Sequence, residues 1–70
     1  MKYVVVYEQT PTGWSAYVPD LPGCVATGAT HEEVKRNIRE AIAFHIEGMR
    51  LERLSIPEPS AWAETVEVSA

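Results

Sequence analysis

The sequence predicts a small α+β domain in which three antiparallel strands precede one long helix and a short closing strand. Three observations predict this order. β-branched and aromatic residues fill short segments of the first 29 positions, and an apolar pattern of helical period follows Thr30. An Ile-Pro-Glu-Pro run over residues 56–59 then excludes further helix. Seventy residues allow one domain over 1–70, with a core of about 2–54, a linker over 55–64 and a strand over 65–69.

The first strand is expected over residues 2–8, where five consecutive positions have β preference. Both of its faces are apolar, so the strand is either central and covered twice or has an outer face that meets another subunit. A hairpin loop over 9–13 leads to a second strand over 14–18, which Pro19 ends because proline has no N–H for the ladder. The third strand, over 24–29, consists of small residues that let a helix approach closely.

The segment between the second strand and the helix carries a turn and a helix start. Pro22-Gly23 suits a type II turn, because Pro presets φ at the second position and Gly accepts a positive φ at the third. Thr30 and Glu33 stand at the spacing of a capping box. The helix is expected from His31 to a residue between 49 and 54. One stripe faces the core: Val34, Ile38, Ala41, Ile42, His45 and Met49.

Composition restricts the classes of function. Six basic and ten acidic residues give a net charge of −4, which argues against a nucleic-acid partner and favours a basic protein. Direct DNA binding is not expected. Cys24 is the only cysteine, which fits a reducing compartment. With neither a signal peptide nor a membrane span recognisable, the sequence predicts a cytoplasmic protein that does not contact a membrane.

No group of residues predicts catalysis, a metal site or a cofactor. Cys24 has no sequence-local base, so a structural role is favoured over a nucleophile. Asp20 and Glu8 are too few for a two-metal nuclease, and Asp20 suits the turn that holds it. His45 lacks a second ligand at metal-binding spacing and is expected to pack in the core or in an interface.

Aromatic residues on so small a sheet predict association with another chain, because an exposed apolar patch of this size is rare on a monomer. A homodimer or homotetramer is expected. The candidate interface residues are Tyr3, Val5, Tyr7, Trp14, Tyr17 and Trp62. A basic helix face consists of Lys35, Arg36, Arg39, Arg50 and Arg53 and could bind duplex RNA through its phosphates. The spacing of Glu32, Arg36 and Glu40 favours a solvated, salt-bridged face instead, and an acidic patch of a protein partner is the next alternative.

A long run over residues 13–24, Gly-Trp-Ser-Ala-Tyr-Val-Pro-Asp-Leu-Pro-Gly-Cys, resembles the HicB-like antitoxin family. The likeness extends over most of the chain up to about Ser60. Its signature positions are Pro19, Asp20, Leu21, Pro22, Gly23, Cys24, Gly28, Thr30, Glu33 and His45. The resemblance implies a truncated RNase H-like fold without the acidic cluster of the nuclease. Leu54 and Ser55 stand where relatives often have a glycine that ends the helix.

The resemblance also implies a function. Members typically neutralise a small RNA-cleaving toxin, HicA, by covering its catalytic surface, and they perform no chemistry. Many carry a C-terminal DNA-binding domain, for which a chain ending at Ala70 leaves no room. The leading hypothesis is therefore a non-enzymatic antitoxin that masks an RNase toxin. The alternatives are an orphan homo-oligomeric binding or regulatory module without a toxin, with RNA as a candidate ligand, and a degenerate nuclease that would depend on Asp20.

Overall fold

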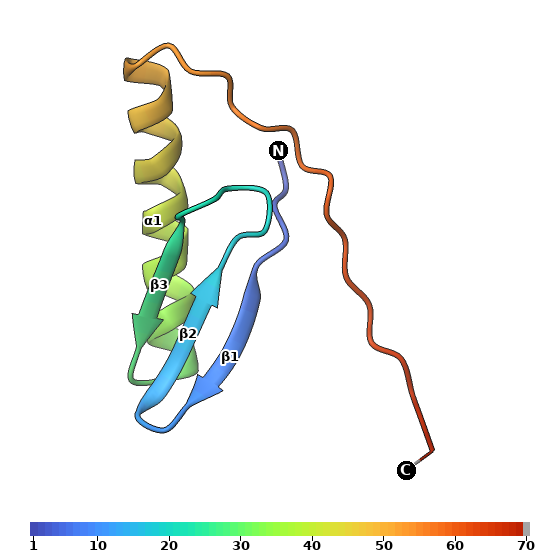
Figure 1. Cartoon of the computed structure of the whole chain (residues 1–70). Helices are drawn as coiled ribbons and strands as arrows, with labels where there is room; N and C mark the ends of the chain where they lie inside the picture. Colours follow the sequence, from blue (N-terminus) through green and yellow to red (C-terminus); the bar gives the residue numbers. More distant parts are fainter. Residues whose placement is uncertain (70) are drawn as a thin grey trace.

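The computed structural model describes residues 1–69 as a three-stranded sheet with one helix packed on one face (Figure 1). The strands are β1 (Val6–Thr10), β2 (Gly13–Tyr17) and β3 (Val25–Gly28), and the helix is α1 (His31–Leu51). Both strand pairs are antiparallel, in the order β1-β2-β3. The predicted α+β class is confirmed, and α1 ends within the predicted range.

The first strand begins later than predicted, at Val6 rather than Lys2, and continues to Thr10. The reason lies in its neighbour. Val6 pairs with Tyr17, the last residue of β2, and the next residue whose backbone would face β1 is Pro19, which has no N–H to donate. Residues 2–5 therefore have β preference but no strand opposite them. The strand is an edge strand of the single chain, which excludes the first of the two alternatives, a central strand covered on both faces.

The segment from Val18 to Cys24 folds into two successive turns, which we call the double turn. The Leu21 N–H donates to the Val18 carbonyl and the Cys24 N–H donates to the Leu21 carbonyl, each over 3.0 Å. Gly23, the third residue of the second turn, has φ of 84°, as a type II turn requires. The predicted Pro22-Gly23 turn is therefore confirmed.

Helix α1 begins at the predicted cap. The Thr30 hydroxyl accepts the backbone N–H of Glu33 over 3.1 Å, which satisfies one of the donors left open at a helix start.

The end of α1 has the hydrogen bonds of a Schellman motif. The Leu54 N–H donates to the Met49 carbonyl over 2.8 Å, and the Arg53 N–H donates to the Arg50 carbonyl over 3.0 Å. Arg53 has φ of 57° in this motif, at the position where helices usually place glycine. The helix thus ends in a Schellman motif that has arginine in place of the usual glycine.

The core lies between the sheet and the first half of α1. Its six buried residues come from β2, the double turn and the helix: Ala16, Val18, Leu21, Cys24, Val34 and Ile38. A close approach of β3 to α1 seals one end, since a Cβ on Gly28 would lie 2.6 Å from the backbone nitrogen of Val34. The small third strand predicted from the sequence serves this approach. The second half of α1 extends past the strands (Figure 1).

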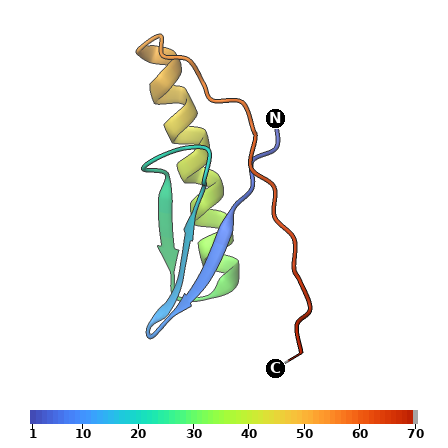
Figure 2. The same cartoon turned by 45° about the vertical axis from the view of Figure 1, so that its right-hand side comes forward.

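After α1 the chain returns along the β1 side of the domain in an extended conformation (Figures 1 and 2). Within the described residues no strand forms after β3. The predicted closing strand over 65–69 is therefore wrong for the single chain. The β preference of this segment has no sheet edge beside it on which to act.

Candidate protein-binding surface

The face of the sheet opposite α1 carries a row of apolar side chains. Val6 pairs with Tyr17, and Tyr17 pairs with Val25, so the three residues lie side by side on one level of the sheet. Ala16, the neighbour of Tyr17, is buried against α1, and alternation therefore points this row away from the helix. Tyr17 is 40% exposed and Val25 is 64% exposed. We call Val6, Tyr17 and Val25 the open-face row.

The level next to this row is polar, because Glu8, Ser15 and Thr27 occupy the corresponding positions of the three strands. The apolar area is therefore confined to the end of the open face near the double turn. An apolar area with a polar border is typical of a protein contact.

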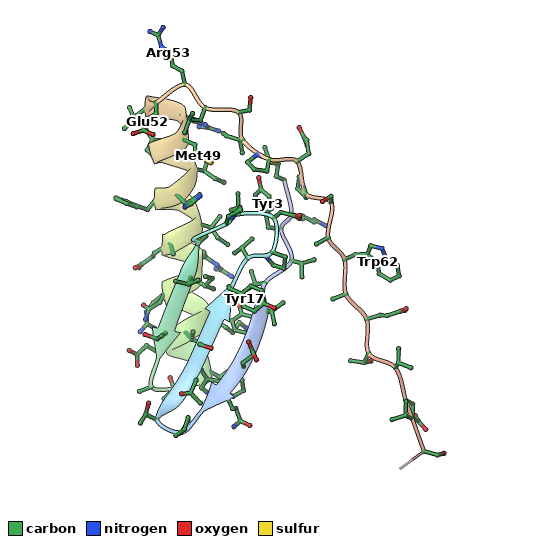
Figure 3. The ribbon with its side chains drawn as sticks, viewed as in Figure 1. Tyr3, Tyr17, Met49, Glu52, Arg53 and Trp62 are labelled. Atoms are coloured by element: carbon green, nitrogen blue, oxygen red, sulfur yellow. The ribbon has the colours of Figure 1, made fainter. Side chains whose placement is uncertain are left out.

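The six predicted interface residues divide into two groups. Tyr3, Val5, Tyr7 and Trp14 point toward α1 and pack, half-buried, against the core. Tyr17 lies in the open-face row and Trp62 extends outward from the C-terminal segment (Figure 3). Only Tyr17 and Trp62 are therefore offered to a partner in this conformation.

The first helical residue also contributes to the aromatic group on the α1 side. The His31 ring lies 5.3 Å from the Tyr7 ring and 4.8 Å from the Trp14 ring, measured between centroids. His31 is itself exposed, as its place in the first helical turn predicts, and no local pattern indicates its contact with the two aromatic rings. The contact contributes to the partial burial of Tyr7 and Trp14.

Asp20 does more than form a turn. Its carboxylate accepts the backbone N–H of Ser60 over 2.9 Å, the Ser60 hydroxyl over 2.9 Å and the backbone N–H of Ala61 over 3.0 Å. These bonds, led by the one from Ala61, lower the pKa of Asp20 below its ordinary value of 3.8. We call this set of contacts the Asp20 anchor. The anchor joins the double turn to the C-terminal segment. No local sequence pattern indicates this connection.

A second contact holds the same segment. The Tyr3 hydroxyl donates to the carbonyl of Pro57 over 2.6 Å. Tyr3 therefore links the N-terminal residues to the Pro-Glu-Pro run.

The surroundings of Cys24 and His45 favour structural roles for both residues. Cys24 is buried in the core, and burial raises the pKa of its thiol, which disfavours the reactive thiolate. His45 lies half-buried on the second half of α1, beside Met49 and Leu54 around a shallow hollow. Over residues 1–69, no three His, Cys, Asp or Glu side chains come together as metal ligands would.

Comparison with known proteins identifies the family. The model of the family described as HicB-like antitoxin of bacterial toxin–antitoxin system matches residues 3–69. The chain belongs to the HicB-like antitoxin family. An antitoxin named HicB 2 of Photorhabdus laumondii is 35% identical over 71 residues, covering all of this chain and 51% of its own length. A UPF0150 protein of Thermoplasma acidophilum is 39% identical over 67 residues, 94% of this chain and 97% of its own.

Two further similarities place this HicB-like chain among longer and structurally known relatives. A phage HP1 protein, described only by its mass and genome position, is 41% identical over 58 residues, which are 83% of this chain and 44% of the phage protein. The chain thus spans about half the length of two of these relatives. A chain in the solved HicA3 and HicB3 toxin–antitoxin complex superposes with a TM-score of 0.73 at 33% identity, over 84% of this chain and 70% of that one. In the described part of the chain, α1 lacks the run of apolar residues that crossing a membrane would require.

Proposed function

We propose that this chain is the antitoxin of a HicA/HicB pair, that it binds a small RNase toxin, and that it inhibits the toxin by covering its surface. The observation that carries the proposal is the similarity to a chain of the HicA3 and HicB3 complex, at 33% identity over 84% of this chain. The net charge of −4 supports it, because a protein that binds RNA phosphates presents a basic surface.

The open-face row is the proposed contact with the toxin. Tyr17 and Val25 are large, exposed and held on a rigid sheet, so a partner can bury them without ordering a loop. Tyrosine is among the residues that contribute most to binding when a partner covers it.

Inhibition in this proposal requires no chemistry from the antitoxin. The Asp20 carboxylate is occupied by three hydrogen bonds to Ser60 and Ala61. Cys24 is buried, with a pKa raised by that burial. These surroundings favour structural roles for the two residues that a catalytic hypothesis would use, and the chain acts by occupying the toxin's surface.

Co-expression with the product of the adjacent short gene tests the proposal. The tagged chain should copurify with that protein and restore growth to cells that express it. Tyr17→Lys should abolish both effects, because it places a charge in the centre of the open-face row. Phe44→Lys is the matched control, since Phe44 is 83% exposed on α1 and far from that row.

Two results would contradict the proposal. One is a neighbouring protein that neither copurifies nor loses its toxicity, as expected for an orphan module. The other is RNA cleavage by the chain itself that Asp20→Asn abolishes, as expected for a degenerate nuclease.

A further inference from the structure

Residues 62–69, which we call the tail, form an extended segment that stands clear of the domain. Trp62, Val66 and Val68 lie on one side of the extended chain, together with Glu64, because residues two apart share a side. Each of the three apolar side chains is about three-quarters exposed, at 76%, 74% and 76%. No strand pairs with the tail within residues 1–69, and the tail runs apart from β1 in both views (Figures 1 and 2). The tail therefore has the sequence pattern of a β-strand but pairs with no sheet.

The start of the tail is fixed in place. The Asp20 anchor holds Ser60 and Ala61, and the Tyr3 hydroxyl holds the Pro57 carbonyl. Pro57 and Pro59 lack the N–H groups that a strand ladder needs. The segment before the tail therefore passes the N-terminal residues without pairing to them, and it directs the tail away from the β1 of its own chain (Figure 3).

The chain also contains an acceptor for such a strand. Among the described residues β1 pairs with β2 alone, so one side of β1 presents unpaired N–H and C=O groups. Natural sheets protect such edges with charges, prolines or a covering segment. Between Val6 and Thr10 the only charged residue is Glu8, and residues 3–5 before them add an apolar extension. The β1 edge is therefore open to pairing.

We propose that the tail of one copy adds as a strand to the β1 edge of a second copy, and that the second copy returns the same contact in a two-fold dimer. Each chain supplies both a free strand and a free edge, which is the condition for a closed reciprocal exchange. Trp62, Val66 and Val68 become buried, and the sheet of each copy gains a fourth strand. The closing strand that the sequence predicts over 65–69 then exists, but in the partner's sheet.

The size of the contact is adequate for a dimer. Eight tail residues at about 3.3 Å each span roughly 26 Å, which is more than the length of β1. With the tail and an edge of similar length on each copy, roughly 16 residues a side take part, somewhat below the 20–30 of a standard interface. The exchange leaves the open-face row uncovered, so this inference is independent of toxin binding.

Cross-linking of the full chain tests which molecule the tail contacts. Trp62 is replaced by the photoreactive aromatic p-benzoylphenylalanine, and equal amounts of ¹⁴N- and ¹⁵N-labelled protein are mixed and irradiated. We expect cross-linked peptides of mixed isotope that join the tail to residues 1–10. Cross-links within one isotope only would overturn the proposal, as would a tail that is captured only when the toxin is present.

Sedimentation of point variants tests the contribution of the apolar side. The unaltered chain should sediment as a dimer. The double variant Val66→Lys with Val68→Lys should raise the dimer dissociation constant by at least about 100-fold, since four valines lose their burial in each dimer. The control Ala63→Lys with Thr65→Lys adds the same charge on the other side of the tail and should change it less than about tenfold.

The outcomes of these measurements are distinct. A monomeric parent chain, or equal effects of the two double variants, would overturn the proposal. All four positions lie outside the core, so each variant should fold. Thermal unfolding checks that it does. Loss of toxin binding in Tyr17→Lys with an intact dimer would leave the tail exchange standing, and the converse result would leave the antitoxin proposal standing.

Discussion

Replacing Gly28 by alanine should destabilise the domain through the close approach of β3 to α1. The added Cβ would lie 2.6 Å from the backbone nitrogen of Val34 and 2.9 Å from its Cα, whereas ordinary contacts begin at 3.4 Å. Because these are backbone atoms, no side-chain rotation relieves the overlap. The start of α1 must move by roughly 0.8 Å, the difference between 3.4 and 2.6 Å. Overpacking of this kind costs about 1–3 kcal/mol.

Urea unfolding followed by circular dichroism measures this cost at a fixed protein concentration, which matters for a chain that associates. In a thermal scan each kcal/mol lowers the midpoint by about 4–8 °C for a domain of this size. Gly48→Ala is the matched control, because Gly48 lies within α1 and a Cβ there meets no atom within 4 Å. It should stabilise the domain by about 0.5–1 kcal/mol. A Gly28→Ala variant as stable as the parent would refute the reasoning.

Five further measurements test single features of the structure. Asp20→Asn should free the tail and speed hydrogen exchange at residues 60 and 61, because an amide offers one acceptor oxygen to three donors. The parent should lose the same contact as pH falls below 3.8 and then through the lowered pKa of Asp20, since a carboxylate with a depressed pKa stabilises the fold only above that range. Thr30→Ala should cost about 1 kcal/mol in urea unfolding, whereas Thr30→Ser should retain the cap. Arg53→Gly should stabilise by about 0.5–1 kcal/mol, the difference between left-handed strain and the entropy of glycine. Cys24 should react with a thiol reagent only as fast as the chain unfolds, because its pKa is raised by burial; fast reaction in the native protein would contradict its position in the core.

Local patterns predicted most of the fold. Thr30 before Glu33 placed the start of α1, and Pro22-Gly23 placed the turn, because both depend on neighbours within four residues. The start of β1 depended instead on where β2 stops, at Tyr17, because Pro19 has no N–H with which to continue the pairing. A strand boundary is a property of a pair, so β preference in one segment could not determine it.

The candidate surface was harder to predict than the fold. An alternating strand has two sides, and Tyr3, Val5 and Tyr7 were assigned to a partner although they pack, half-buried, against the core. Tyr17 lies on the other side and is 40% exposed. The second role of Asp20 depends on residues forty positions further along the chain, a distance at which no turn or cap pattern operates.

The Asp20 anchor also has a consequence for the order in which the molecule folds. Its bonds join residues 40 and 41 positions apart, and the bond from Tyr3 to Pro57 spans 54, whereas the hairpins and α1 form from near neighbours. Closing such long loops costs chain entropy that only a formed sheet can offset. The anchor is therefore expected to close last in folding, after a stage in which the sheet and helix are complete but the tail is unanchored. Encounters between new chains at that stage are where pairing with the wrong partner would begin.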